Sequence, residues 1–317
     1  VNFYEVQEAF NEHWEGKTYE RGKGYKQYKR WEYFMEPRVY PTGNRPSTET
    51  LYKEWEKAVR SSSQQAKSDT PWESIGPVDW ISQGWNPGLG RVNAVIEDPN
   101  NMDKLYVATP SGGLWKSEDG GSSWTVLTDN LPAIGASGLA IDPDNSDIMY
   151  LATGDGNGSD TYSLGVMKSE DGGQSWEPTG LSFEVTDGVR CSRILMDPSN
   201  SARLYVATHA GLFVSTDAGE TWDQPINNVV RDIEIKPADP SVVYVSGRRF
   251  YKSTDFGESF DQISDGTPPF GAVNRLAIAV SPASPDHVYM VASSQENSGF
   301  YGLYKSTNSG VSFSLQS

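Results

Sequence analysis

The sequence predicts an all-β repeat fold built from four-stranded units, preceded by an α-helical extension. Two observations predict it. After residue 70, short β-rich runs alternate with turns of Gly, Asp, Asn and Ser, and one eight-residue segment recurs five times. Residues 1–60 instead carry apolar residues at helical spacing. The expected organisation is a helical extension over 1–60, a linker over 61–70 and a repeat array over 71–317.

The helical extension is indicated by large apolar residues that recur every three or four positions. They do so over Phe3–Trp14, Tyr28–Met35 and Leu51–Val59, and Pro37 is expected to end the second helix. Helices this short need a surface to pack against. We therefore expect the extension to dock on the repeat array through its bulkiest residues. These are Phe3, Phe10, Trp14, Trp31 and Trp55.

The recurring segment, called the box here, has the pattern S-x-[DN]-x-G-x-[ST]-[WF]. It occupies residues 117–124, 169–176, 215–222, 253–260 and 306–313. Its third position holds Asp119, Asp171, Asp217, Asp255 and Asn308. Its last position holds Trp124, Trp176, Trp222, Phe260 and Phe313. The third residue is expected to accept hydrogen bonds from turn N–H groups, and the aromatic ring to pack between sheets. Both roles are structural rather than catalytic.

Strand signals surround each box. The run Lys104–Thr109 has counterparts before every other box, and a further strand ending in a Pro turn precedes each run. A strand opening with Trp or Phe follows the box. The unit is therefore strand, turn, strand, turn, strand, box, strand. Four antiparallel strands per repeat are typical of a β-propeller blade.

The box resembles the Asp-box, or BNR repeat. Asp-boxes occur in sialidases, sortilin-type Vps10 propellers, family 74 glycoside hydrolases and photosystem II stability factors. The resemblance covers residues 71–317 and implies an Asp-box β-propeller. It implies little about activity, because these families differ in function.

The array is expected to continue beyond the chain. Trp72–Ile75 has the form of a fourth strand but has no box before it, whereas the fifth repeat already has Phe313–Gln316. This pattern predicts at least one further blade, and so at least six in total.

Two enzyme families were compared with the chain at their motifs. Family 74 glycosidases carry an Asp in T-D-V-G-G, and the matching stretch here is Thr109–Gly113 with Pro110 at the Asp position. Sialidases carry an F-R-I-P-type start that is absent here. No G-x-S-x-G, H-E-x-x-H, P-loop or G-x-G-x-x-G occurs. No catalytic residue is therefore predicted.

Five arginines are candidate ligand-binding residues because they lie at or near the starts of first strands, close to the propeller axis. They are Arg91, Arg190, Arg193, Arg231 and Arg275. They are expected either to form an anion site at the channel mouth or to pair with acidic loops. The loop Gly154–Asp160 offers oxygen ligands that could suit calcium. No other metal or cofactor is predicted.

Charge and composition limit the partners. Acidic residues outnumber basic ones 42 to 26, and the excess lies after residue 70, which disfavours nucleic acid. No apolar run is long enough for membrane insertion. Cys191 is the sole cysteine, which excludes an internal disulfide and Cys-based zinc sites.

Residues 1–60, with Asn2–Phe10 and Gly22–Met35, resemble the start of large secreted Bacteroidota proteins. That resemblance implies a cargo of the type IX secretion translocon, located extracellularly or at the outer-membrane surface. The expected function is a sortilin-like binding or scaffolding module with a glycan or protein ligand, more an interaction protein than an enzyme. The alternative is a glycan-active hydrolase, sialidase-like or family 74-like, that uses the axial face.

Overall fold

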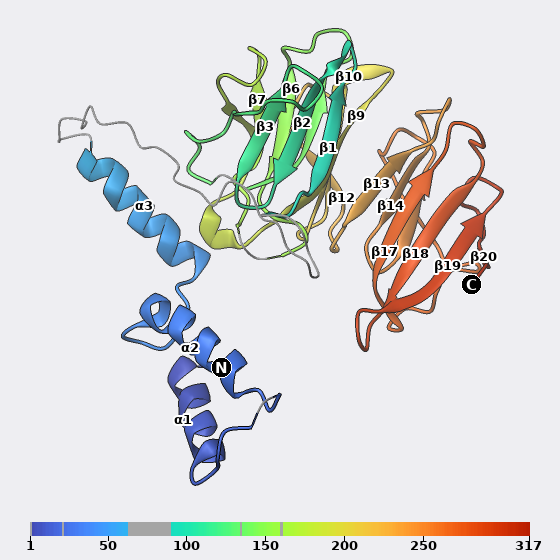
Figure 1. The fold of residues 1–317 in the computed structure, drawn as a ribbon. Coiled ribbons are helices and arrows are strands. Elements are labelled where there is room, and N and C mark those ends of the chain that lie inside the picture. The colour runs from blue at the N-terminus through green and yellow to red at the C-terminus, as the bar shows by residue number, and fades with distance from the viewer. Residues whose placement is uncertain (1, 21, 63–89, 134, 159–160) are drawn as a thin grey trace. The chain divides into compact units, whose positions relative to one another are not determined.

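The computed structural model describes residues 2–20, 22–62, 90–133, 135–158 and 161–317. The chain divides into two compact units, Val1–Ser68 and Asp69–Ser317, called the helical unit and the sheet unit here (Figure 1). The predicted stray strand Trp72–Ile75 lies outside the described residues. Within the described ranges, no helix is both long and apolar enough to cross a membrane.

The described residues of the helical unit form three helices, α1 (Phe3–Trp14), α2 (Tyr25–Val39) and α3 (Thr48–Ser62). Asn2 caps α1 because its side chain accepts from the Tyr4 N–H at 2.9 Å. Aromatic rings join α1 to α2: Phe10 stacks on Tyr28 with centroids 3.6 Å apart, and Phe3 lies 5.3 Å from Trp31. The predicted docking of this unit on the sheets stays a prediction.

The expectation that Pro37 ends the second helix is wrong. The helix continues to Val39, and the Tyr40 N–H still bonds to the Glu36 carbonyl at 3.1 Å. A proline removes only its own N–H bond and disturbs the preceding turn. Only one turn follows it here, and the bonds beyond it can still form.

The sheet unit is all-β, as predicted, and its described residues form five four-stranded antiparallel sheets in simple sequential order. The first strands are β1 (Ala94–Asp98), β5 (Ala136–Ile141), β9 (Cys191–Asp197), β13 (Asp232–Ile235) and β17 (Val273–Val280). The second strands are β2 (Asn101–Thr109), β6 (Met149–Thr153), β10 (Asn200–Thr208), β14 (Val243–Ser246) and β18 (Val288–Ser294). The third strands are β3 (Gly113–Ser117), β7 (Gly165–Ser169), β11 (Leu212–Ser215), β15 (Phe250–Ser253) and β19 (Phe300–Ser306). The fourth strands are β4 (Thr125–Val126), β8 (Glu177–Ser182), β12 (Asp223–Ile226), β16 (Asp261–Ile263) and β20 (Ser314–Leu315).

This topology gives the sheet unit two different faces. Because the strands alternate in direction, the starts of all first strands lie at the same end as the connections between second and third strands. We call this end the loop face. The boxes connect third to fourth strands, so they lie at the opposite end, the box face.

Hydrophobic clusters fill the space between neighbouring sheets. Alternate residues of one strand face opposite clusters: Leu204 and Val206 of β10 pack toward the second sheet, and Tyr205 and Ala207 toward the fourth. The five sheets therefore stack side by side through apolar side chains (Figure 1).

Buried tyrosines on second strands tie each sheet to the next box. The Tyr150 hydroxyl donates to the Ala218 carbonyl at 3.0 Å, and the Tyr205 hydroxyl to the Phe256 carbonyl at 2.8 Å. Both tyrosines are fully buried. Each bond joins a sheet to the box of the following repeat.

Candidate functional site

The loop face carries a cluster of arginines around one loop. Residues Gly154–Gly158 follow β6, and side chains from four other sheets reach them. The contacts are Arg91 to the Asp155 carboxylate, Arg190 to the Gly158 carbonyl, Arg231 to the Gly156 carbonyl at 3.3 Å, and Arg275 to Asn157 Oδ1 at 2.6 Å. Four of the five predicted arginines therefore converge. We call this group the axial cluster, because the sheets curve around the loop that it holds.

The axial cluster is rich in positive charge. Three of the four contacts described above use neutral carbonyl or amide oxygens, and only Asp155 is acidic. Burial lowers the pKa of Arg231, and the charges of Arg275, Arg190 and Arg248 lower it further. A bound anion would relieve this repulsion.

His209 lies within the same positive field. Burial, and then the charge of Arg190, lowers its pKa to about 4, so the imidazole is neutral near pH 7. Its Nδ1 lies 3.3 Å from the Arg190 carbonyl, and its buried Nε2 has no hydrogen-bond partner in the described chain. His209 therefore adds a polar group, and no charge, to the loop face.

Arg193 stands apart from the axial cluster, with two carboxylates. It contacts Asp232 at 2.5 Å and Glu234 at 2.9 Å, both on the neighbouring strand β13. Asp232 also accepts the Ile278 N–H of the fifth sheet at 2.9 Å. Burial raises the pKa of Glu234, although Arg193 opposes this. Three sheets thus hold one acidic pair beside the first strands.

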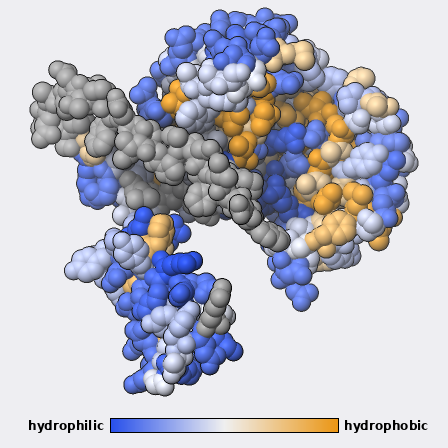
Figure 2. Space-filling view, in the orientation of Figure 1, coloured by the Kyte–Doolittle hydropathy of each residue, from blue (hydrophilic) through white to orange (hydrophobic). Residues whose placement is uncertain are grey.

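Two cavities also open at loop-face residues. One, of about 610 Å³, is lined by Arg91, Pro110 and Trp115 among others. Another, of about 310 Å³, lies between the fourth and fifth sheets and is lined by Arg231, Arg248 and Arg249 among others. In Figure 2, the visible side of the sheet unit is hollowed, with hydrophobic and hydrophilic residues around the hollow.

The boxes form a different kind of structure on the box face. In the second box, Ser169 donates to Asp171 at 2.8 Å, while Ser175 donates to it through both its N–H and its hydroxyl. The other boxes repeat this pattern. At the fifth, the Asn308 amide instead donates to Ser312 at 2.9 Å. Every acceptor is thus bonded within its own turn.

The box rings are less buried than expected. Phe313 is 7% exposed, whereas Trp124 is 38% exposed, and the other three are half-buried. The indoles of Trp124 and Trp222 each donate back to a glycine carbonyl of their own box at 3.0 Å. This bond holds each of the two rings over its own turn.

Arginine side chains contact the loop after β6 that the sequence suggested as a calcium site. Asp155 and Asn157 each accept from a guanidinium, so a divalent cation would sit beside several positive charges. Asp160 lies outside the described residues. Over the described ranges, no cluster of three or more His, Cys, Asp or Glu is placed to hold a metal ion.

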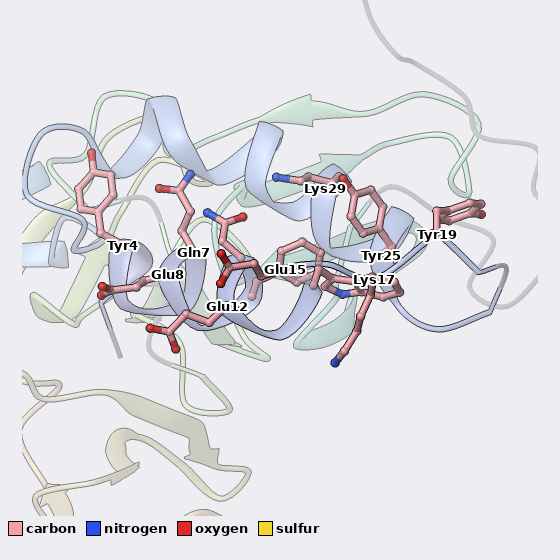
Figure 3. A pocket seen from close by; sticks show the side chains of 12 residues that line it. Tyr4, Gln7, Glu8, Glu12, Glu15, Lys17, Tyr19, Tyr25 and Lys29 are labelled. Atoms are coloured by element: carbon pink, nitrogen blue, oxygen red, sulfur yellow. The ribbon is translucent and has the colours of Figure 1, made fainter.

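The helical unit has a cavity of about 930 Å³ along α1 and α2. Figure 3 shows Gln7, Glu8 and Glu12 spread along α1 and pointing in different directions, rather than meeting at one point. This arrangement does not assemble a catalytic set.

Comparisons with known proteins point to glycoside hydrolases. Over 160 residues the chain is 30% identical to a xyloglucanase of Paenibacillus sp, covering 47% of this chain and 16% of the relative. Over 224 residues it is 26% identical to a xyloglucanase of Hypocrea jecorina, covering 67% of this chain and 26% of the relative. The chain thus spans about a quarter or less of these relatives. No family model matches it.

Solved structures support the fold. The chain resembles an ancestral GH74 enzyme with a TM-score of 0.60 and 22% identity, covering 74% of this chain and 32% of that one. It resembles a Niastella koreensis GH74 enzyme with a TM-score of 0.50 and 19% identity, covering 71% and 45%. These likenesses support a propeller-like arrangement of the five sheets.

These findings correct the functional expectation. The sequence was interpreted as a binding or scaffolding module, more an interaction protein than an enzyme, and the matches to proteins named xyloglucanases contradict that interpretation. They favour the alternative, a glycan-active hydrolase. The error came from giving too much weight to one position, Pro110. Of the resemblances named, the family 74 one is supported.

Sequence reasoning missed several loop-face residues. Arg248 and Arg249 form the tip of the β14–β15 hairpin. Two adjacent arginines in a short turn could have indicated a second group of positive charges on this face. Asp232 and Glu234 were missed because alternate acidic residues on a strand usually face solvent. Phe270 lies in a connection that carried no pattern.

Proposed function

We propose that the sheet unit is part of a glycan-active hydrolase of the family 74 kind, which holds its glycan against the loop face. The observation that carries the proposal is the match to proteins named xyloglucanases, which reaches 67% of this chain. The proposed substrate class is a β-linked plant-type glucan.

The loop face offers surfaces that suit a sugar chain. The 610 Å³ cavity exposes an aromatic ring at Trp115, whose indole N–H donates to the Gly112 carbonyl at 2.7 Å and so fixes the ring. Sugar-binding clefts combine such apolar surfaces with a few polar groups. Trp115 is therefore proposed as a platform for one sugar unit.

Hydrolysis of a glycosidic bond requires two carboxyl groups, one as acid and one as base or nucleophile. Pro110 cannot supply one of them. We assign the acid to Glu234, because burial raises its pKa and so favours the protonated form, and the base or nucleophile to Asp232, which contacts the same Arg193. Two residues apart on β13, they lie on the same face of the strand, and both carboxylates contact Arg193.

The proposal is tested by incubating the chain with xyloglucan and with mixed-linkage β-glucan and measuring released reducing ends. Glu234→Gln should lower the rate by about a hundredfold or more, because the leaving oxygen loses its proton donor. Glu177→Gln, an exposed carboxylate on β8, is the matched control. Thermal melting of each variant reports whether it is folded.

Two outcomes would contradict the proposal in different ways. No cleavage of either polysaccharide by the unaltered chain would refute the hydrolase function of this chain. Cleavage that survives Glu234→Gln would refute only the assignment of the acid.

Extracellular location is proposed with this function, since plant-type polysaccharides are met outside the cell. Export by the type IX translocon remains an untested prediction from residues 1–60.

A further inference from the structure

We infer that the 310 Å³ cavity between the fourth and fifth sheets is a binding site for an anionic sugar residue, one that carries a carboxylate or a sulfate. We call it the arginine pocket. That its ligand is a sugar rests on the proposed function; that its ligand is an anion rests on the lining residues themselves.

The arginine pocket draws its walls from three separate segments. Arg231 precedes β13, Arg248 and Arg249 form the turn of the β14–β15 hairpin, and Phe270 and Asn274 lie just before and at the start of β17. A volume of about 310 Å³ is at the lower end of the range for small-ligand sites, which suits a single sugar unit.

The charge of the pocket is opposite to that of the chain. The whole sequence has a net charge of −16, yet the described lining of this pocket holds three arginines and no acidic residue. Along the described chain, neither Arg248 nor Arg249 forms a salt bridge, and the buried Nε of Arg249 has no hydrogen-bond partner. Guanidinium groups pair best with carboxylate, sulfate or phosphate oxygens.

An exposed aromatic ring lies beside these charges. The Arg249 guanidinium lies 4.1 Å from the centre of the Phe270 ring, and Phe270 still remains 64% exposed. The stacking orients the guanidinium. The exposed part of the ring can pack against the C–H face of a sugar, an interaction that a bare inorganic anion does not use.

The arginine pocket adjoins the axial cluster. Arg231 lines the pocket and also donates to the Gly156 carbonyl of the central loop. A glycan lying on the loop face could therefore place a charged substituent in the pocket while its backbone continues toward the centre. A glucan that carries acidic substituents would then bind more tightly than the same glucan without them.

Isothermal titration calorimetry with the full chain tests the inference, at fixed low salt. The ligands are tetragalacturonate, a sulfated tetrasaccharide, neutral cellotetraose and inorganic sulfate. We expect at least one of the two acidic oligosaccharides to bind about tenfold or more tightly than cellotetraose, and more tightly than sulfate. The carboxylated and sulfated arms identify the anionic group.

Variants separate the pocket from general charge effects. Arg248→Gln with Arg249→Gln should weaken binding of the acidic oligosaccharide about tenfold or more. Arg30→Gln with Arg45→Gln removes the same charge from exposed sites of the helical unit and should leave affinity unchanged. Phe270→Ala should weaken sugar binding several-fold and leave sulfate binding unaltered.

Equal affinity for cellotetraose, or full affinity in the double arginine variant, would overturn the inference. Sulfate binding as tightly as the acidic sugars would refute the sugar part. If acidic oligosaccharides bind but neither glucan is cleaved, the proposed hydrolase function is refuted and the binding site is supported. If a glucan is cleaved but no acidic oligosaccharide binds, the hydrolase function is supported and the binding site is refuted.

Discussion

The two faces of the sheet unit are held together in opposite ways. On the box face, Asp171 takes its bonds from Ser169 and Ser175, within one eight-residue segment. On the loop face, Arg275 reaches Asn157 across 118 positions of sequence. The box face repeats one local arrangement in every sheet. The loop face instead has a single cluster, whose residues come from several sheets.

This difference separates stability from recognition. A local turn needs no contacts with distant residues, so it can be repeated in every sheet. Its hydrogen bonds can therefore contribute to the stability of each sheet. A cluster built from several sheets exists only in the folded unit, and its residues vary between sheets. Changes on the box face should therefore alter stability, and changes on the loop face should alter binding.

Acid should have the largest effect, through the box face. Hydrogen bonds from Ser123 and Ser175 lower the pKa of Asp119 and of Asp171 to about 2, from an ordinary 3.8. A lowered pKa stabilises the fold above the ordinary value, and that stability is lost as pH falls through the folded pKa. The unfolding temperature should therefore drop between pH 4 and pH 2, measured by circular dichroism.

The fifth box suggests the control for this experiment. Asn308 makes the same turn without a titratable group. Asp119→Asn with Asp171→Asn should flatten the pH dependence. An unchanged acid transition in that variant would mean that the boxes do not govern it.

Gly257→Ala should have the next largest effect. A Cβ at this position would lie 2.7 Å from Cε1 of the buried Tyr205, and its φ of +84° is strained for alanine. We expect a loss of about 2–4 kcal/mol in the free energy of unfolding, from strain and overpacking together. Urea unfolding measures it.

Gly121→Ala is the matched change in the first box, where φ is +92° and the nearest atom to the added Cβ, Cζ2 of Trp124, lies at an ordinary contact distance of 3.5 Å. Only the backbone strain remains, so about 1 kcal/mol is expected. Equal losses at both sites would refute the role of the contact with the neighbouring sheet.

Tyr205→Phe should have the smallest effect. It removes the hydroxyl that bonds to the Phe256 carbonyl of the next box, a loss of about 1 kcal/mol. Tyr289 occupies the equivalent position in β18 and is 37% exposed, so Tyr289→Phe should change stability by less than about 0.5 kcal/mol. Thermal melting compares the two, and indistinguishable results would argue against the tie between sheets.

Much of the fold was readable from the sequence because its signals are local. The run Lys104–Thr109 lies within β2, and the box lies between the third and fourth strands as expected. Phe3–Trp14 bounds α1 as its apolar spacing predicted. The prediction at Pro37 was wrong because it assumed that a proline always ends a helix. Here the helix continues for less than one turn after the proline.

The candidate site was readable only in part. The sequence predicted that the arginines lie near the axis, because the starts of the first strands meet there. It left open whether they form an anion site or pair with loops, and in the structure four of them contact the loop after β6. The arginine pocket and the Asp232–Glu234 pair carried no recognisable motif. Their residues are ordinary in sequence and become unusual only when neighbouring sheets bring them together.

The sequence by itself determined the strands, the box turns and the order of the sheets, because each depends on residues within a few positions of one another. Only the tertiary structure decided which charges meet on the loop face, which carboxyl groups share Arg193, and which aromatic ring stays exposed beside Arg249. Those contacts depend on how the sheets curve around a centre. That curvature is set by the packing between sheets, which no single repeat encodes.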